Sequence, residues 1–192
     1  NRIDYFKNLN INAVQLMPVM EFEGNESWGY NTSFHMALDK RYGSEAKLKE
    51  FIDLCHQNGI AVIFDIALNH VYGRSALERM WMTDTDGDGW ANGITSENPY
   101  CNANAMHSYS VGRDLNHFNT ANLTQYYVER TIAHWIENFK IDGFRWDLTK
   151  AFTNNCPAGS SQESCTNNYQ ADRVSKLKEY ADMQWQLDST FY

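Results

Sequence analysis

The chain has 192 residues, of which 43% are hydrophobic, 14% aromatic and 21% charged, so it carries enough apolar material for one folded core. Its formal net charge is -8, and its pI of ≈ 5.2 argues against binding to nucleic acid or to an anionic membrane surface. No apolar run approaches the roughly 20 residues of a membrane span, so we expect no membrane insertion.

The chain opens with a helix pattern at residues 4–9 and shows no secretory leader. We expect an internal piece of a longer protein, in which case the missing leader says nothing about export. Residues 11–17 predict a strand that Pro18 ends. A long loop follows, and it contains the sequence Trp-Gly-Tyr-Asn at residues 28–31.

The next two patterns predict a helix and a second strand. The helix begins near Ser44 and stops at Gly59. The strand covers residues 60–66 and ends in polar residues. Four apolar side chains recur at helical spacing on one face of the helix: Leu48, Phe51, Ile52 and Cys55.

Residues 71–118 show no helix period and many Asp, Asn and Gly residues, and they are too many for a plain connector. We therefore predict an inserted, loop-rich subdomain. Within it, Asp84, Asp86 and Asp88 are followed by Gly89, which matches the first half of a calcium loop. The twelfth position is Thr95 instead of Glu, so the bidentate ligand is missing. An acidic turn without metal is the alternative.

The last third of the chain repeats the helix–strand alternation. A helix from about residue 120 precedes a strand at residues 141–147, a polar loop, a helix at 172–186 and the onset of another strand at 188–192. The expected inward side chains are Val128, Ile132, Trp135, Ile136 and Phe139 in the first helix, and Val174, Leu177, Ala181 and Trp185 in the second.

The polar loop is bracketed by Cys156 and Cys165. A disulfide between them would close a short ring and contribute roughly 2–3 kcal/mol. Such a bond suits an oxidising compartment, so we expect a secreted or periplasmic protein. Cys55 is expected to be a buried thiol, and Cys101 has no obvious partner.

In the strand at residues 141–147, alternate side chains share a face. Arg145 and Asp147 lie on one side, roughly 6–7 Å apart along the strand, and Phe144 and Trp146 face the helices. The guanidinium favours the ionised carboxylate, which is the form required of a nucleophile in glycosyl transfer. A purely structural Arg–Asp pair is the alternative.

Strands that alternate with helices predict a parallel α/β sheet, either an open doubly wound sheet or a closed barrel. No Gly-x-Gly-x-x-Gly follows any of the strands, which weakens a nucleotide-binding interpretation. Polar residues gather at the carboxyl ends of strands, where barrel active sites are built.

Two motifs, Asp65-x-x-x-Asn69-His70 and Gly143-x-Arg145-x-Asp147, resemble signatures of the α-amylase family of glycoside hydrolases. The resemblance implies part of a (β/α)8 barrel. Barrel strands two and three would lie in residues 1–70, the insert in 71–118, and strand four with the start of strand five in 119–192. An unrelated parallel α/β enzyme remains only if both matches are accidental.

The resemblance also implies roles for single side chains. Asp147 would be the nucleophile, and Arg145 would hold it ionised and oriented. His70 would hydrogen-bond the central sugar and Tyr30 would stack on it. Asp65 is expected to be structural. Core packing is the alternative for Tyr30. Trp28 would line the same cleft. Lys150 would touch the leaving-group side, and an ordinary solvated lysine is the alternative.

By the same resemblance, Asn69 and Asp114 would hold a structural calcium ion between barrel and insert, since hard oxygen ligands suit calcium. Ala151 stands where many members have a histidine, which leaves one sugar subsite and part of the metal shell in doubt. The family's acid/base glutamate would follow strand five, beyond Tyr192.

We therefore expect the parent protein to be a retaining α-glucan hydrolase, or a branching, debranching or transglycosylating member of the same family, with its substrate linkage left open. The substrate would be a starch- or glycogen-like polysaccharide or its oligosaccharides. The isolated chain, without the acid/base and the rest of its own barrel, is expected to be inactive. A carbohydrate-binding or scaffold relative without chemistry is the alternative.

Overall fold

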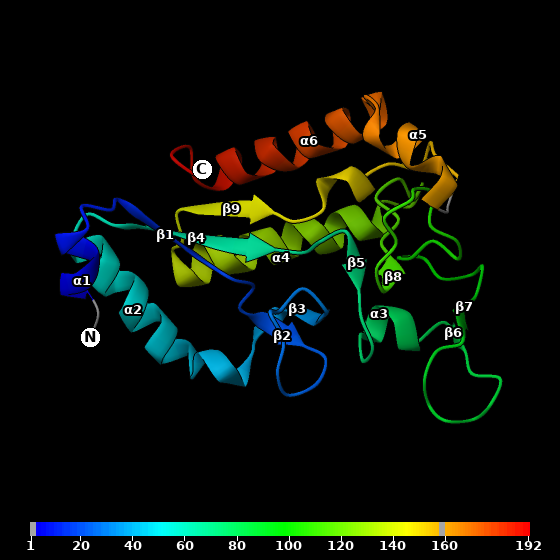
Figure 1. Ribbon diagram of the computed structural model, residues 1–192, viewed down its shortest axis with the longest axis horizontal. Coiled ribbons are helices and arrows are strands. Elements are labelled where there is room, and N and C mark those ends of the chain that lie inside the picture. The colour runs from blue at the N-terminus through cyan, green and yellow to red at the C-terminus, as the bar shows by residue number, and fades with distance from the viewer. Residues whose placement is uncertain (1–2, 158–159) are drawn as a thin grey trace.

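The computed structural model describes residues 3–157 and 160–192 and is built around a parallel three-stranded sheet with the order β1–β4–β9 (Figure 1). Its strands are β1 (Ala13–Leu16), β4 (Ala61–Ile66) and β9 (Gly143–Trp146). The amide of Tyr192 donates to the carbonyl of Asp142 at 2.8 Å, and the amide of Phe144 donates to the carbonyl of Tyr192 at 3.1 Å. This is the pattern of a parallel neighbour at Tyr192 alone, and residues 189–190 of the predicted strand onset form a turn.

Three helices lie along the sheet (Figure 1), and each follows one of its strands: α2 (Glu45–Gln57), α4 (Leu123–Phe139) and α6 (Ala171–Leu187). The predicted boundaries of α2 are confirmed. The Ser44 side chain accepts from the amide of Lys47 at its start, and Gly59 takes a φ of +70° just after its end.

The core is formed between the sheet and α4. Trp135 and Phe64 are fully buried and meet edge to face with ring centroids 5.5 Å apart. The indole of Trp135 donates to the carbonyl of His35 at 2.7 Å, which satisfies its buried N–H. All five predicted inward residues of α4 are buried: Val128, Ile132, Trp135, Ile136 and Phe139.

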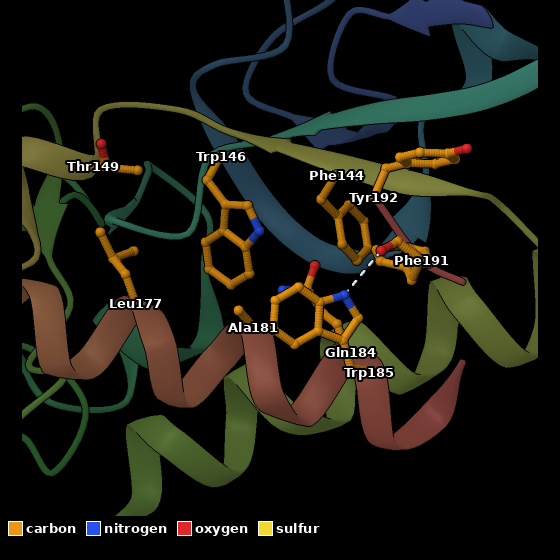
Figure 2. A pocket seen from close by; sticks show the side chains of 9 residues that line it. All are labelled: Phe144, Trp146, Thr149, Leu177, Ala181, Gln184, Trp185, Phe191 and Tyr192. Carbon is orange, nitrogen blue, oxygen red and sulfur yellow. Dashed lines mark hydrogen bonds between the residues drawn. The ribbon is translucent and has the colours of Figure 1, made fainter. Parts of the chain in front are cut away.

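Of the four inward side chains predicted for α6, Val174, Leu177 and Ala181 are half-buried, and Leu177 packs against the main core. Tyr180 and Gln184 are its buried residues, whereas Trp185 is 54% exposed, so its inward placement was wrong. The reason is the stacking of Tyr180 on Trp146 of β9, with ring planes 8° apart, which fixes the rotation of the helix. Trp185 instead donates to the carbonyl of Phe191 at 3.0 Å, at the edge of an apolar pocket between α6, β9 and the end of the chain (Figure 2).

The long loop after β1 contains a hairpin that the sequence did not predict. It pairs β2 (Met20–Phe22) with β3 (Thr32–Leu38), and a short 3-10 helix, η1 (Lys40–Tyr42), follows. The register of this pair is shifted at two places, so no regular alternation of apolar residues marks it in the sequence. Ahead of the sheet stands the short helix α1 (Ile3–Asn8).

The segment after β4 folds into short elements around a small core of its own, made by Val71, Ile94, Cys101 and Leu115. The elements are β5 (His70–Val71) paired with β8 (Arg113–Asp114), α3 (Ala76–Arg79), and β6 (Met82–Thr83) paired with β7 (Gly93–Ile94).

After β9 the chain forms η2 (Thr149–Ala151), η3 (Ser160–Gln162) and α5 (Glu163–Asn167). Residues 158–159 of the predicted polar loop lie outside the described residues. In the part of the chain that is described, no helix has the length and apolar character to cross a lipid bilayer.

Two buried histidines predict a loss of stability in acid. Burial lowers the pKa of His35 to about 4 and that of His117 to about 3. In the unfolded chain both would have the ordinary value near 6.5, so below that pH the unfolded state binds more protons than the folded state. The free energy of unfolding should therefore fall by up to about 1.4 kcal/mol per histidine and pH unit between pH 6.5 and about 4.

Urea unfolding at pH 7.5, 6 and 5 measures this slope. The His117 ring stacks on Phe152 with ring centroids 4.2 Å apart, and His117→Phe keeps an aromatic ring there. This variant should remove about half of the dependence of the unfolding free energy on pH. An unchanged slope in His117→Phe would show that other groups carry the pH dependence.

Candidate active site

Asp65 is the centre of a polar network at the carboxyl end of β4. Its side chain is buried, and it accepts from Arg145 Nη1 with both carboxylate oxygens, at 3.0 and 3.1 Å. The Tyr30 hydroxyl donates to the same carboxylate at 2.8 Å. Asp65 and Arg145 are direct partners in the register between β4 and β9, so strand pairing brings them together. This arrangement agrees with the structural role expected of Asp65.

Arg145 links this buried carboxylate to Asp147. The same Nη1 atom donates to Asp147 Oδ1 at 2.5 Å. The hydrogen bond to Asp65 is the largest cause that raises the pKa of Arg145, so the guanidinium stays charged between two carboxylates. The Asp147 side chain is 22% exposed. A carboxylate held from one side and open on the other can meet a substrate atom.

Tyr30 and His70 lie on the other side of Asp65. His70 Nε2 donates to the carbonyl of Tyr30 at 2.7 Å, and the Tyr30 hydroxyl is engaged by Asp65. Burial, followed by the bond to Asp65, raises the pKa of Tyr30 to about 12. The Tyr30 hydroxyl is therefore neutral and donates to Asp65, while the backbone carbonyl of Tyr30 is held by His70.

His70 uses one of its two ring nitrogens within the chain, and its contact with a sugar stays a prediction. The ring is buried, its Nε2 is used on Tyr30, and its Nδ1 is also buried, without a hydrogen-bond partner in the described residues. Burial lowers the pKa of His70, so the ring is neutral near pH 7. In this conformation it orients Tyr30, and a hydrogen bond to a sugar requires the ring to turn.

The Trp-Gly-Tyr motif has a backbone reason for its glycine. Gly29 has a φ of +93°, and a Cβ at this position would lie 2.4 Å from the carbonyl oxygen of Pro18. Only glycine therefore allows the loop to approach the end of β1 this closely. Trp28, beside it, is 77% exposed, which excludes a role in core packing.

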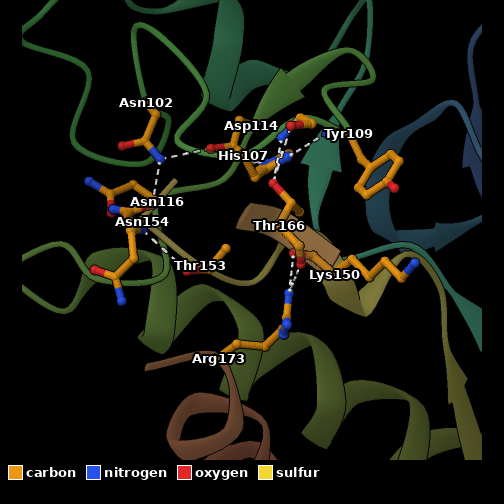
Figure 3. A network of polar contacts seen from close by, with 12 residues as sticks. Asn102, His107, Tyr109, Asp114, Asn116, Lys150, Thr153, Asn154, Thr166 and Arg173 are labelled. Atoms are coloured by element: carbon orange, nitrogen blue, oxygen red, sulfur yellow. Dashed lines mark hydrogen bonds and ion pairs between the residues drawn. The ribbon is translucent and has the colours of Figure 1, made fainter. Parts of the chain in front are cut away.

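Lys150 is held by residues that the sequence did not single out. Its Nζ donates to Asn167 Oδ1 at 2.6 Å. The same atom lies 5.4 Å from the centre of the Tyr109 ring (Figure 3). The Tyr109 hydroxyl donates to the same oxygen of Asn167 at 2.9 Å. Lys150 is exposed, and these two contacts hold its ammonium group in place. These contacts join distant stretches of the sequence, and no local motif marks them.

The predicted disulfide is present. The Sγ atoms of Cys156 and Cys165 are 2.08 Å apart, while Cys55 and Cys101 are buried free thiols. The amide of Cys156 donates to the carbonyl of Met106, which ties this loop to the inserted segment.

Asn69 and Asp114 are adjacent because β5 pairs with β8. The carbonyl of Asn69 accepts from the amide of Leu115 at 3.0 Å. Asp114 accepts from His107 Nε2 and from Asn102 Nδ2, each at 2.7 Å (Figure 3), and each of its oxygens has a further lone pair.

The side chain of Asn69 is buried, and neither its oxygen nor its nitrogen has a hydrogen-bond partner in the described part of the chain. Buried amides are rarely left unpaired in this way, and a hard cation is a fitting partner for the oxygen. The residues present therefore fit an oxygen-coordinated cation at this place.

The acidic loop is the other place where a metal ion could be held. One carboxylate oxygen each from Asp84, Asp86 and Asp88 lie within 4.8 Å of one another. All three side chains are exposed, and Asp84 also accepts from the amides of Gly87 and Gly89.

The fold defines a class, namely part of a (β/α)8 barrel, with polar side chains at the carboxyl ends of neighbouring strands. Residues 1–85 match the family described as alpha amylase, catalytic domain. By this match, residues 1–85 belong to the α-amylase family of glycoside hydrolases.

A malto-oligosyltrehalose trehalohydrolase from Saccharolobus solfataricus is 25% identical over 156 residues, which cover 81% of this chain and 25% of the relative. A 1,4-alpha-glucan branching enzyme from Pseudomonas fluorescens is 32% identical over 146 residues, or 76% of this chain and 18% of the relative. Type I pullulanase from Bacillus subtilis, solved in complex with maltose, matches with a TM-score of 0.72 at 20% identity, covering 98% of this chain and 24% of that one.

This last similarity shows the fold alone. The chain spans a quarter or less of the length of these relatives.

Proposed function

We propose that the protein carrying this chain cleaves or transfers α-glucans by a retaining mechanism, with Asp147 as the nucleophile. The observation that supports it most is the continuous network from Tyr30 through Asp65 and Arg145 to Asp147, at the carboxyl ends of adjacent parallel strands.

In the first step, an Asp147 oxygen attacks the anomeric carbon, and a C–O bond to the enzyme forms as the glycosidic C–O bond breaks. The leaving oxygen takes a proton from an acid, which in this family is a glutamate after the following strand. In the second step, water or a sugar hydroxyl releases the glycosyl group and returns a proton to that glutamate. Arg145 holds the Asp147 carboxylate in place through its hydrogen bond to Oδ1.

The names of the relatives favour a second candidate within the same chemistry, in which a sugar hydroxyl is the acceptor or an α-1,6 linkage is attacked. One relative is a branching enzyme and another is a pullulanase. Incubating the full-length protein with linear maltohexaose and with a branched glucan distinguishes them. Shorter linear products indicate hydrolysis, longer or branched products indicate transfer, and debranched chains indicate α-1,6 cleavage. No change in either substrate would contradict both candidates.

We further propose that the cation held by Asn69 and Asp114 is calcium, with a second calcium ion at Asp84, Asp86 and Asp88. Carboxylate and amide oxygens are the ligands that calcium prefers, and the unpaired buried oxygen of Asn69 supports the first site. When bound, such an ion would hold the inserted segment against the end of β4.

Calcium removal should therefore lower thermal stability. At a free calcium concentration about 100 times the Kd, one site contributes about 2.7 kcal/mol. Each kcal/mol shifts the Tm by about 2–4 °C in a chain of this size. We expect chelation to lower the Tm by about 5–10 °C and calcium to restore it.

Asp114→Asn should abolish the larger part of this response, and exchange of the exposed Asp182 for Asn should leave it intact. If adding calcium to the chelated wild-type chain leaves the Tm unchanged, both calcium sites are wrong.

The disulfide supports a third proposal, that the protein functions in an oxidising compartment such as the periplasm or the extracellular space. Disulfides persist in such compartments and are rare in the reducing cytosol. Fractionation of the source cells, followed by thiol labelling of Cys156 and Cys165, would test it. Detection of the protein only in the cytosol, with both thiols reduced, would contradict it.

A further inference from the structure

The short helix α5 holds the ammonium group of Lys150 from a different segment of the chain. Asn167, at the end of α5, accepts with one oxygen from two donors, which are Lys150 Nζ at 2.6 Å and the Tyr109 hydroxyl at 2.9 Å. The ammonium group also lies 5.4 Å from the centre of the Tyr109 ring (Figure 3). The three side chains therefore form a closed triangle, in which Asn167 is the shared acceptor.

The ammonium group of Lys150 keeps donors for a ligand. A lysine carries three N–H donors. In the part of the chain that the structure describes, one of them is donated, to Asn167, which leaves two. Lys150 is exposed and lies in η2, three residues after Asp147 and beyond the carboxyl end of β9. Its two remaining donors can therefore meet oxygen atoms of a ligand bound next to Asp147.

Helix α5 takes its position from the segments around it. It has 5 residues, and a helix this short is unstable by itself. Thr166 is buried, and its hydroxyl accepts from the amide of Ser108 at 3.0 Å. Arg173 Nη1 donates to the carbonyl of Thr166 at 2.9 Å and to that of Lys150 at 3.0 Å (Figure 3). One guanidinium thus joins α5 to the backbone of η2.

The disulfide gives α5 a covalent tether. Cys165 lies inside the helix, two residues before Asn167, and Cys156 belongs to the segment that follows η2. Cys156 is fully buried, and its amide donates to the carbonyl of Met106 at 3.0 Å. The disulfide therefore links α5 to a buried anchor, and it restricts where Asn167 can stand relative to Lys150.

We propose that Asn167 is a positioning residue for Lys150, and that the Cys156–Cys165 disulfide keeps Asn167 in place for this role. Lys150 then offers its two remaining donors, in a fixed direction, to hydroxyl oxygens of the sugar on the leaving-group side. The proposal rests on the proposed function and adds how that side of the substrate is held. Without Asn167, substrate binding would have to restrict a mobile lysine side chain, which weakens binding and leaves the chemistry at Asp147 unchanged.

Steady-state kinetics of the full-length protein test the role of Asn167, on whichever of maltohexaose and a branched glucan it turns over. Asn167→Ala is expected to raise KM about tenfold, as for the loss of a hydrogen bond to a charged group, with kcat within about twofold. Asn167→Asp keeps an oxygen acceptor and should restore KM to near the wild-type value. The matched control is Asn168→Ala, which changes an exposed neighbour and should leave both constants unaltered.

A double-variant cycle shows whether Asn167 acts through Lys150. Lys150→Met should raise KM by at least as much as Asn167→Ala does. Adding Asn167→Ala to Lys150→Met should then bring no further increase. Additive increases in KM would overturn the positioning role, and so would a wild-type KM in Asn167→Ala or an equal increase in Asn168→Ala.

Replacing Cys156 and Cys165 together by Ser tests the tether. In a variant that keeps a cooperative thermal transition, KM should rise several-fold with kcat retained, and Asn167→Ala should add less than it does in wild type. If the serine pair does not fold, dithiothreitol treatment of the folded wild type makes the same comparison, since one dithiol is oxidised as the bond is reduced to two thiols. A wild-type KM after loss of the disulfide would overturn its part in the proposal.

The proposed function fails by different results. If wild type turns over neither glucan, both the function and the positioning role are wrong. If Asp147→Asn keeps full turnover while Asn167→Ala raises KM, the nucleophile is misassigned and the role of Asn167 stands. If Asp147→Asn loses turnover and Asn167→Ala keeps the wild-type KM, only the positioning role is wrong.

Discussion

Replacing Asp147 by Asn is expected to lower the kcat/KM of the full-length protein on α-glucans by about 10⁴-fold or more. The amide preserves the size of the side chain and a hydrogen-bond acceptor for Arg145, but it cannot form the covalent ester of the retaining mechanism. Stability should change little, because Asp147 is partly exposed. Initial rates on maltohexaose, with the Tm measured on the same samples, provide the test.

Asp182→Asn is the matched control, since it makes the same chemical change at an exposed position of α6. It should retain wild-type activity. If Asp147→Asn keeps more than about a tenth of the activity, Asp147 is not the nucleophile, and the Arg145–Asp147 contact is structural.

Replacing Arg145 by Met is expected to destabilise the fold by about 2–4 kcal/mol. Asp65 is almost fully buried, and without Arg145 its charge would be left with only neutral donors. The cost is smaller than for a fully buried pair because the Arg145 side chain is 46% exposed and partly screened by water. Urea unfolding of the 192-residue chain near pH 7 measures this change.

The double variant Arg145→Met with Asp65→Asn removes both charges and should recover a large part of the lost stability. Arg41→Met is the control, since Arg41 pairs with the exposed Glu26 at 3.5 Å and should cost less than about 1 kcal/mol. If the double variant is as unstable as the sum of the single ones, the pair is not energetically coupled.

The sheet and its helices could be predicted from local pattern. Helix α2 carries a side-chain cap at Ser44, apolar residues at helical spacing and a glycine stop, and these signals are contained within one stretch of sequence. Likewise Arg145 and Asp147 are two residues apart in one strand, so their proximity follows from strand geometry.

Contacts between distant stretches could not be predicted in this way. The use of both oxygens of Asp65 by Arg145 depends on the register between β4 and β9, which no single strand encodes. The burial of His70 depends on the loop that carries Tyr30. The exposure of Trp185 depends on how Tyr180 of the same helix stacks on Trp146 of β9, which the helical period of α6 does not encode.

The residues that sequence reasoning did not identify share one property: their partners lie in distant segments of the chain. Tyr72 directly follows β5, and no local sequence motif contains it. Its ring lies against Gly112 and lines one pocket with Trp28, and both contacts are set by the tertiary fold. Asn167 and Tyr109 hold Lys150 across more than one segment. Such residues carry no motif, because their partners are set by tertiary packing.

The most direct test of the account is to identify the residue that becomes covalently attached to sugar. The full-length protein is incubated with a fluorinated α-glucosyl donor that slows the second step, then digested and examined by mass spectrometry. With Asp147 as the nucleophile, one added glycosyl mass is expected on the peptide containing Asp147, and this mass is lost in Asp147→Asn. A glycosyl group attached to another carboxylate, or products with inverted anomeric configuration and no adduct, would contradict it.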